Sequence, residues 1–356
     1  MQKLFTILCL AITFFSQAQV STLYVGSYTD GKSEGIYSYQ FNSETGSLKN
    51  KLLVAKTKNP SFLITNAKKN HVFSVSELND YNNSKSGAIE SYKVKEDGTL
   101  EKISEMSSLG AHPCHLALNE KEDQLIVSNY TGGNFSLFSI KENGAIDIIK
   151  QAVSLNTDSI KAHTHSAKFV NNNLYVADLG INTIEHFTFN DSTYVSTNSI
   201  AMEKNSGPRH FEITKNEDYM YVINEYGNTI STLKKENTSY VRQNDVSTLR
   251  ADYKEKNSCA DIHLSKNENF LYGSNRGENT IAVFERNKKN GSLKKIQSIS
   301  CEGNWPRNFV IGPKGNFLLV ANQKSNNISV FLIDKNSGEL TFIYSVESAN
   351  PTCLTF

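Results

Sequence analysis

The chain carries almost no net charge. Its 37 lysines and arginines nearly balance its 36 aspartates and glutamates, which leaves a formal charge of +1 over 356 residues. Without a surplus of one sign, the molecule has no global electrostatic field that could hold nucleic acid or an anionic membrane. The composition therefore argues against those partners and favours a small ligand that is recognised locally.

Several local patterns are also missing. No long stretch shows helical periodicity, no glycine-rich loop precedes a helix, and no G-x-S-x-G turn occurs. These absences argue against a nucleotide-binding phosphate loop and against the nucleophile elbow of an α/β-hydrolase. The chain contains instead short β-branched or aromatic runs between clusters of Asn, Gly and Ser, which predict an all-β fold.

Residues 1–18 have the pattern of a secretory signal peptide. Lys3 precedes an apolar run from Leu4 to Phe15, and Ser16 and Ala18 stand at the small-residue positions of a cleavage site before Gln19. We therefore expect an exported protein, periplasmic or secreted, that has no membrane attachment after cleavage. Its remaining residues, 19–356, are predicted to form one domain.

A five-residue motif of the type N-P-x-x-L recurs seven times. Successive second residues of the motif lie 44 to 53 positions apart, as the steps from Thr164 to Pro208 and from Pro60 to Pro113 illustrate. A four-stranded propeller blade occupies roughly 40 to 50 residues, so seven copies predict a seven-bladed β-propeller. The copies are NPSFL (Asn59), HPCHL (His112), HTHSA (His163), GPRHF (Gly207), SCADI (Ser258), WPRNF (Trp305) and NPTCL (Asn350).

A second motif, an alternating strand, follows each of the first six copies by about a dozen residues. Its copies read VFSVSEL, LIVSNY, LYVADL, MYVINEY, LYGSNR and LLVANQ. A seventh, LYVGSY from Leu23 to Tyr28, has no first motif before it, and NPTCLTF at the other end has no second motif after it. We predict that this C-terminal strand enters the N-terminal blade and closes the ring without an exposed edge.

Cysteine is scarce, with five residues in the chain. Cys9 falls within the leader, and Cys114, Cys259 and Cys353 lie in copies of the first motif. A small apolar thiol packs well in such a strand. We therefore expect Cys114, Cys259, Cys301 and Cys353 to be free thiols, even in an oxidising compartment.

The two motifs together predict which residues surround one mouth of the channel. In a propeller the first strand of each blade lies nearest the axis and the second runs antiparallel to it, so first-strand starts and second-strand ends share a mouth. The first strands place there Ser61, Phe62, Cys114, His115, His165, Ser166, Arg209, His210, Ala260, Asp261, Arg307, Asn308, Thr352 and Cys353. The second strands end at Glu77, Asn129, Asp178, Asn224, Asn275, Asn322 and Ser27, followed by Leu78, Tyr130, Leu179, Glu225, Arg276, Gln323 and Tyr28.

These positions differ in residue type from blade to blade and include charged groups and imidazoles. Positions used only for packing would carry small or apolar residues in every copy, so the variation predicts a functional site. The alternative is that polar channel residues bond only to each other and to trapped water, as in non-catalytic propellers.

Longer segments identify a resemblance. LYVGSYT with GIYSYQFNSETGSL, HTHSA with LYVADLG, GPRHFEI with YVINEYGNTIS, CADIHLS with FLYGSNRGENTIAVF, and PRNFVIGPKGNFLLVANQKSNNISVF resemble the lactonase family of seven-bladed propellers. That family contains bacterial 6-phosphogluconolactonase and is similar to the fungal carboxy-muconate cycloisomerases. The resemblance spans essentially the whole chain after the leader. It implies a pocket that uses His165, Arg209, Glu225 and Arg276, with His163 beside them, to open a small-molecule lactone.

Lactone hydrolysis gives these residues physical roles. Attack of water on the carbonyl builds negative charge on oxygen, which Arg209 or Arg276 can stabilise. A guanidinium group also suits a substrate carboxylate or phosphate. His165 is the first candidate for the base and Glu225 the second, although Glu225 could instead hold an arginine in place.

Five further residues are candidates for orienting or binding the substrate. They are His115, His163, His210, Asp261 and Arg307. His163 with His165, or His112 with His115, could suggest zinc, but a tetrahedral site needs further ligands at matched positions. Asn and Asp at the strand ends more often serve turns than calcium. We therefore expect no metal and no cofactor.

Two other functions are compatible with the sequence. A cycloisomerase or lactonising enzyme acting on an acyclic dicarboxylate would use the same residues, because two arginines suit two carboxylates. The other possible function is that of a non-enzymatic binding propeller of the cell envelope. The leader favours it somewhat, since 6-phosphogluconolactone is a cytoplasmic metabolite that an exported enzyme would not normally meet.

Overall fold

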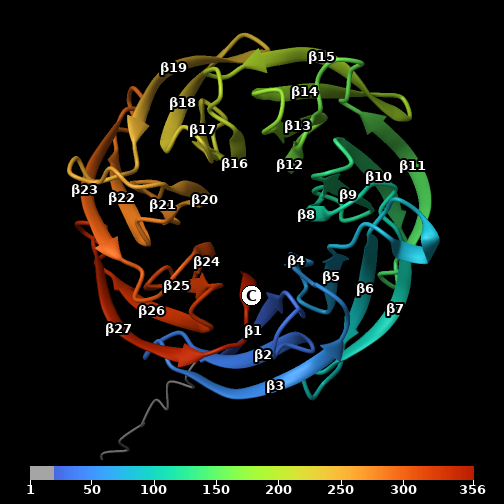
Figure 1. The fold of residues 1–356 in the computed structure, drawn as a ribbon, viewed down its shortest axis with the longest axis horizontal. Coiled ribbons are helices and arrows are strands. Elements are labelled where there is room, and N and C mark those ends of the chain that lie inside the picture. Colours follow the sequence, from blue (N-terminus) through green and yellow to red (C-terminus); the bar gives the residue numbers. More distant parts are fainter. Residues whose placement is uncertain (1–19) are drawn as a thin grey trace, which may run out of the picture.

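Seven four-stranded antiparallel sheets are arranged as a ring in the computed structural model of the chain, which describes residues 20–356 (Figure 1). The seven-bladed propeller predicted from the repeats is thereby confirmed. The signal peptide predicted for residues 1–18 lies outside the described residues. Within the described range, no helix is long and apolar enough to cross a membrane.

The first four blades along the chain each contain four strands in order. The blade that includes both ends of the described chain has the order β28 (Pro351–Thr355), β1 (Val20–Ser27), β2 (Gly35–Asn42), β3 (Leu48–Lys56). The next blade contains β4 (Leu63–Thr65), β5 (His71–Ser76), β6 (Ala88–Val94) and β7 (Leu100–Ser107), with a short 3-10 helix, η1 (Tyr81–Asn83), between β5 and β6. The third contains β8 (Pro113–Leu118), β9 (Gln124–Asn129), β10 (Asn134–Ile140) and β11 (Ile146–Ser154). The fourth contains β12 (Thr164–Val170), β13 (Asn173–Asp178), β14 (Thr183–Asn190) and β15 (Thr193–Ala201).

The last three blades repeat this order. The fifth contains β16 (Pro208–Ile213), β17 (Tyr219–Asn224), β18 (Thr229–Glu236) and β19 (Ser239–Ser247). The sixth contains β20 (Ser258–Leu264), β21 (Phe270–Arg276), β22 (Thr280–Arg286) and β23 (Leu293–Ser300). The seventh contains β24 (Pro306–Ile311), β25 (Phe317–Asn322), β26 (Asn327–Ile333) and β27 (Leu340–Glu347).

Short asparagine turns join the first and second strands of several blades. The side-chain oxygen of Asn66 accepts hydrogen bonds from the backbone N–H groups of Asn70 and His71, at 3.0 and 2.9 Å. Asn119 bonds in the same way to the backbone of Asp123 and Gln124. Asparagine favours such turns because its side chain satisfies nearby backbone donors. These turns fix where each second strand begins.

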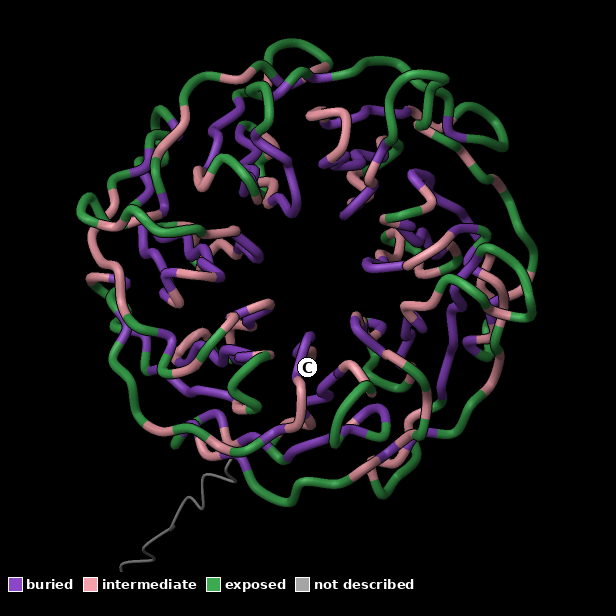
Figure 2. Tube along the Cα trace, in the orientation of Figure 1, coloured by how far each residue is buried: buried purple, intermediate pink, exposed green. Residues whose placement is uncertain are grey.

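The hydrophobic core lies between neighbouring blades. One cluster, for example, combines Ile126 and Phe135 of one blade with Val176 and Phe187 of the next. The inner strands are mostly buried, whereas the outermost strand of each blade is largely exposed (Figure 2). A propeller therefore needs no single central core, and the axis remains available for polar side chains.

The ring closes as predicted. β28 pairs antiparallel with β1, with Leu354 opposite Val25 and Cys353 opposite Gly26. The four cysteines of the described chain are free and buried, in agreement with the expectation of packing thiols. Both neighbouring clusters include the closing strand, since Cys353 belongs to one and Leu354 to the other.

Two details differ from the sequence prediction. β1 begins at Val20, three residues before the predicted Leu23. β5 ends at Ser76, which pairs with the first residue of β6 just as Asn224 pairs with the first residue of β18. Glu77 is therefore the residue after the strand, equivalent to Glu225, and not the strand end as the motif alignment predicts.

Candidate functional site

A β-bulge near the start of the inner strands sets which side chains enter the channel. Pro208 and His210 of β16 pair with successive residues of β17, so Arg209 between them has no partner in the ladder. A bulge of this kind bends the strand and re-aims the extra residue. It explains how two successive residues of one strand can both contribute to the site. The same irregularity occurs at Cys114, His165, Arg307 and Thr352.

Glu225 joins two arginines from neighbouring blades. Its Oε2 accepts a hydrogen bond from Nη1 of Arg209 and forms an ion pair with Nη2 of Arg276 at 2.8 Å. Both arginine side chains are about 5% exposed, so the Glu225 carboxylate balances two buried positive charges. Burial alone would raise the pKa of Glu225, but Arg209 and Arg276 hold it below its usual value. Glu225 is therefore ionised, and its charge is paired with Arg209 and Arg276.

Arg276 is fixed from a second direction by the backbone. Its Nη2 donates to the carbonyl of Cys259 at 2.9 Å and its Nε donates to the carbonyl of Ser258 at 3.3 Å. Burial, together with the charge of Arg209, lowers the pKa of Arg276 to about 9. The indole of Trp305 lies against the same guanidinium, with 5.4 Å between its ring centre and Cζ.

A third arginine completes the cationic side of the mouth. Nη2 of Arg307 donates to the hydroxyl of Tyr28 at 2.8 Å, and this hydroxyl donates to Oε2 of Glu77 at 2.8 Å. The positive charge of Arg307 also lowers the pKa of Glu225, so Arg307 is electrostatically coupled to the group formed by Glu225, Arg209 and Arg276. Three arginines face two glutamates in this mouth, so one positive charge is in excess. Such a pocket favours an anionic ligand or an oxyanion.

Three imidazoles lie next to this charged group. The ring of His210 lies 5.1 Å from that of His165 and 5.5 Å from that of His115, measured between ring centres. Burial lowers the pKa of His165 and of His115 well below the usual value, and Arg209 lowers both further. Nδ1 of His165 is buried and has no hydrogen-bond partner. Each of these rings is neutral near pH 7.

His163 lies beside the cluster. Its ring stacks on Tyr130 with 4.6 Å between ring centres, and its Nδ1 donates to the backbone carbonyl of Tyr130 at 3.0 Å. Tyr130 also meets the edge of His165, with 5.8 Å between the ring centres. His163 therefore supports the wall of the pocket through Tyr130.

Asp261 lies deeper in the channel and accepts several hydrogen bonds. Nδ1 of His210 bonds to its Oδ1 at 2.7 Å, and Nδ2 of Asn308 donates to its Oδ2 at 2.6 Å. The backbone N–H groups of Ile262 and Phe309 donate to it as well. Burial alone would raise the pKa of Asp261, but His263 and His210 hold it well below its usual value.

A row of ion pairs continues from Asp261 along the channel wall. Nε2 of His263 lies 3.1 Å from Asp261, Nδ1 of His263 lies 3.0 Å from Glu212, and Glu212 pairs with Lys168 at 2.7 Å. Burial alone would lower the pKa of His263, but Asp261 and Glu212 raise it to about 10. These groups, with His115 and His210, line a small cavity of about 60 Å³.

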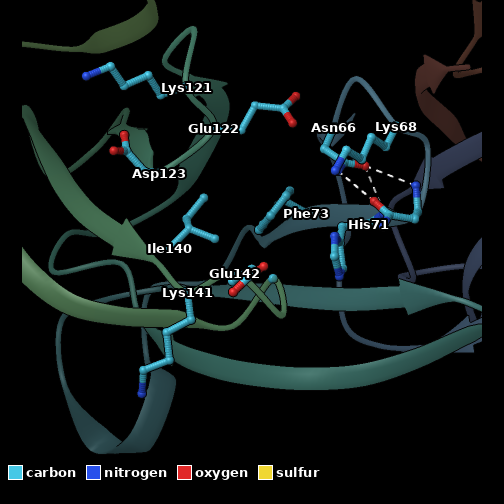
Figure 3. A pocket seen from close by; sticks show the side chains of 12 residues that line it. Asn66, Lys68, His71, Phe73, Lys121, Glu122, Asp123, Ile140, Lys141 and Glu142 are labelled. Atoms are coloured by element: carbon cyan, nitrogen blue, oxygen red, sulfur yellow. Dashed lines mark hydrogen bonds between the residues drawn. The ribbon is translucent and has the colours of Figure 1, made fainter.

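A larger cavity, of about 340 Å³, lies away from the channel between the turns of two neighbouring blades (Figure 3). Its polar groups are used locally. Asn66 bonds to the backbone of its own turn, and Glu122 accepts a hydrogen bond from the backbone of Ala67. It lacks the buried unpaired donors and acceptors that distinguish the channel, so we place the candidate site at the channel mouth.

The structure brings the predicted residues together to different degrees. Arg209, Glu225 and Arg276 are in direct contact, and His165 lies close enough for the charge of Arg209 to lower its pKa. His115, His210 and Asp261 form a deeper layer, whereas Arg307 and His163 lie on opposite sides. Among residues 20–356, no group of three His, Cys, Asp or Glu side chains is arranged to hold a metal ion.

Sequence reasoning placed Glu77, Tyr28 and Tyr130 at the mouth but did not select them as candidate site residues. All three follow directly on the end of a second strand, the position that Glu225 occupies in its own blade. The signal was present for the two tyrosines, which the alignment placed at this position. For Glu77 the alignment was one residue out of register.

Comparison with known proteins supports the resemblance. Residues 22–356 match the family model described as "Lactonase, 7-bladed beta-propeller". A 6-phosphogluconolactonase of Bacillus subtilis is 31% identical over 300 residues, covering 82% of this chain and 84% of its own. A 6-phosphogluconolactonase of Formosa agariphila is 35% identical over 318 residues, covering 82% and 87%. The solved structure of a periplasmic gluconolactonase from Pseudomonas aeruginosa superposes with a TM-score of 0.86 at 28% identity, covering 94% of this chain and 98% of that one.

Proposed function

Because the chain belongs to the family of seven-bladed lactonase propellers, we propose that it hydrolyses a sugar lactone at the mouth of its channel. The observation that carries this proposal is the joining of buried Arg209 and Arg276 through Glu225, next to a neutral imidazole cluster. Fixed cationic donors and a neutral base lie side by side there. The opening of an ester by water requires this combination.

The arginines would stabilise the charge that forms on the lactone carbonyl. Attack by water turns the carbonyl oxygen into an oxyanion, and donors that are fixed beforehand stabilise it without reorganising. Arg209 suits this role because its Nε is a buried donor without a partner. Arg276 and Arg307 are held by other groups of the protein, so they suit recognition of a fixed anionic or hydroxyl group of the substrate.

Glu225 fits a positioning role better than that of the base. Its carboxylate is shared by two guanidinium groups, which keep its pKa below the usual value. An efficient general base has a pKa near the working pH. The proton of the attacking water therefore goes to an imidazole in this proposal, and Glu225 holds the arginines in place.

The substrate class we propose is an unphosphorylated aldonolactone. The signal-peptide pattern of residues 1–18 favours a substrate outside the cytoplasm. The relative from Pseudomonas aeruginosa is named a periplasmic gluconolactonase, which agrees with such a location. The two relatives named 6-phosphogluconolactonase make the phosphorylated lactone the alternative substrate to be tested.

A hydrolysis screen tests the proposal. The chain without residues 1–18 would be assayed with glucono-δ-lactone, 6-phosphoglucono-δ-lactone and an acyclic dicarboxylate, with and without EDTA. We expect catalysed opening of glucono-δ-lactone that EDTA does not change. Arg209→Ala should lower kcat/KM roughly 100-fold or more, as for loss of an oxyanion donor, and His165→Ala should lower it as well.

Arg242→Ala is the matched control. This arginine lies in the exposed outer strand β19, where it pairs with Glu203 and Asp245, so its loss should leave the rate within about twofold. A wild-type protein that opens no lactone faster than the buffer, or a folded Arg209→Ala variant with the wild-type rate, would contradict the proposal. Turnover of the dicarboxylate alone would favour a cycloisomerase.

A further inference from the structure

His210 differs from the other two imidazoles of the channel because one of its ring nitrogens is bound to a carboxylate. Its Nδ1 bonds to Oδ1 of Asp261 at 2.7 Å, while its Nε2 is buried and has no partner. The histidine itself is about 9% exposed. A buried ring nitrogen without a partner costs free energy unless a ligand or water reaches it.

The surroundings of Asp261 determine which nitrogen of His210 carries the proton. Asp261 accepts hydrogen bonds from Asn308 and from the backbone N–H groups of Ile262 and Phe309, and it faces the protonated ring of His263. With so many donors the carboxylate stays ionised and can only accept. The proton of neutral His210 must therefore lie on Nδ1, which leaves a free lone pair on Nε2.

Neither of the other rings has this arrangement. Nδ1 of His115 accepts a hydrogen bond from the backbone N–H of Ala167 at 3.4 Å, so the proton of His115 lies on Nε2. Among residues 20–356 no carboxylate hydrogen-bonds to His165, and burial, together with the charges of Arg209 and Arg307, disfavours a second proton on its ring. His210 alone combines a free acceptor with a carboxylate that stabilises the imidazolium formed when it takes a proton.

Several charged and titratable groups surround His210 from the elements packed around it. Arg209 precedes it in β16, and Glu212 follows it in the same strand. The others are His115 of β8, His165 and Lys168 of β12, and Asp261 and His263 of β20. Burial and the positive charges lower the pKa of His210, whereas the hydrogen bond and charge of Asp261 raise it.

We propose that His210, positioned by Asp261, is the general base of the lactone hydrolysis proposed above. Nε2 of His210 takes one proton from the water whose oxygen bonds to the carbonyl carbon. When the ring C–O bond breaks, the imidazolium returns this proton to the leaving oxygen, which becomes the hydroxyl group. The products are one hydroxy acid and the unchanged enzyme, so atoms and charge balance. This inference rests on the proposed function.

Two variants, compared with the wild type, test the assignment through the rate and its pH dependence. His210→Gln should lower kcat roughly 100-fold or more, the usual contribution of a general base. In the wild type, kcat/KM should fall on the acid side of neutrality as His210 becomes protonated, because burial lowers the pKa of His210 below its usual value. Asp261→Asn removes the group that raises the pKa of His210, so the rate should fall and this acid limb should move to lower pH. A merely structural role of Asp261 would not move the limb.

Glu212→Gln is the matched control for Asp261→Asn. It also removes one carboxylate that pairs with His263, but Glu212 is only partly buried and makes no hydrogen bond to His210. We expect it to shift the acid limb much less than Asp261→Asn. An equal shift in both variants would overturn the specific role of Asp261.

Chemical rescue keeps the test decisive if the variants lose stability. In His210→Ala, added imidazole should restore part of the rate in proportion to the concentration of its neutral form. If the wild type is active and folded His210→Gln keeps the wild-type rate and pH profile, His210 is not the base, while the lactonase proposal stands. If His210→Ala is inactive but imidazole never restores activity, the assignment also fails. A wild type that opens no lactone overturns both proposals.

Discussion

At the scale of single residues, Glu225 holds the two most buried guanidinium groups of the mouth. Arg209 and Arg276 come from different blades, and both form ion pairs with the same carboxylate oxygen. Taking charges out of water is costly, so a group of this kind is stable only while every member keeps its partner. The geometry of the pocket therefore depends on one side chain that need not touch the substrate.

Glu225→Gln should destabilise the fold by roughly 3 kcal/mol, because it leaves two buried arginines without a compensating charge. It should also change the response to acid. The pKa of Glu225 lies below 4.5 in the folded protein, so the ionised group adds stability above about pH 4.5 that is lost as the pH falls. The variant should therefore lose less stability than the wild type between pH 5 and 3. Urea unfolding at several pH values measures both effects.

Glu203→Gln provides the control for this prediction. Glu203 pairs with Arg242 on the exposed face of the molecule, where an ion pair contributes about 1 kcal/mol or less. If both variants lose the same small amount of stability, Glu225 does not hold the arginines as described.

The residues of the site could be predicted from the sequence to the extent that they follow the repeat. Arg209, Glu225 and Arg276 were placed at one mouth because their positions recur in every blade. Glu77 was misplaced because VFSVSEL offers no mark of where its strand ends. The proton positions of His115 and His210 depend on contacts between blades, which no local pattern contains.

At the scale of the strand, most inner strands are preceded by an unusual backbone conformation, which we call the strand entry. The five motif copies that contain proline have a residue of positive φ directly before it, and the copies without proline, at His163 and Ser258, do not. These residues are Asn59, His112, Gly207, Trp305 and Asn350, with φ between 45° and 68°. The bulge follows two positions later in four of these copies, so the left-handed residue, the proline and the bulge together turn the chain into the channel.

Gly207→Ala tests the importance of this entry. Gly207 has a φ of 65°, and an added Cβ would lie 2.8 Å from the ring of Tyr226. We expect a loss of roughly 1 to 2 kcal/mol in unfolding free energy, because an L-residue is strained in the left-handed region. Denaturant unfolding measures this loss, and the rate of lactone opening reports any shift of the neighbouring Arg209.

Gly31→Ala is the control for that measurement. Gly31 has no atom within 4 Å of an added Cβ and its φ is not in the left-handed region, so its change should stay within about 0.5 kcal/mol. Equal effects of the two substitutions would show that the entry tolerates any residue.

At the strand entry, the sequence repeat predicts where most inner strands begin but not how their backbone bends. The prolines indicated where first strands begin, and β8, β16, β24 and β28 do begin there. The bulge was not predicted, because it appears only in the register between two strands. β4 begins three residues after its proline and spans only three residues, a difference that the NPSFL motif does not indicate.

At the scale of the whole molecule, every blade contributes to the mouth. Tyr28, Glu77, Tyr130, His165, Arg209, Arg276 and Arg307 come from seven different sheets. Their distances are set by how the blades pack around the ring, so the pocket exists only when the ring is complete. Closure by β28 is therefore a condition for an intact mouth as well as for stability.

Removal of residues 351–356 should leave β1 with an unpaired edge and open two hydrophobic clusters. We expect the melting temperature to fall by roughly 10 °C, as loss of several kcal/mol predicts. The exposed edge should also promote association, which light scattering detects. Thr355→Ala keeps the strand and should have little effect. A truncated protein that melts like the wild type and scatters no more light than it does would contradict the role of β28.

The closing strand also has a consequence for biosynthesis. While a ribosome is still making the chain, the first blade has only the three strands β1, β2 and β3, because β28 begins 295 residues after the end of β3. Until then β1 is an open template that any passing extended peptide could occupy. Premature termination within the final codons would thus yield a nearly complete protein in which the edge of β1 is unpaired. Chaperones and proteases would be expected to bind such an exposed edge.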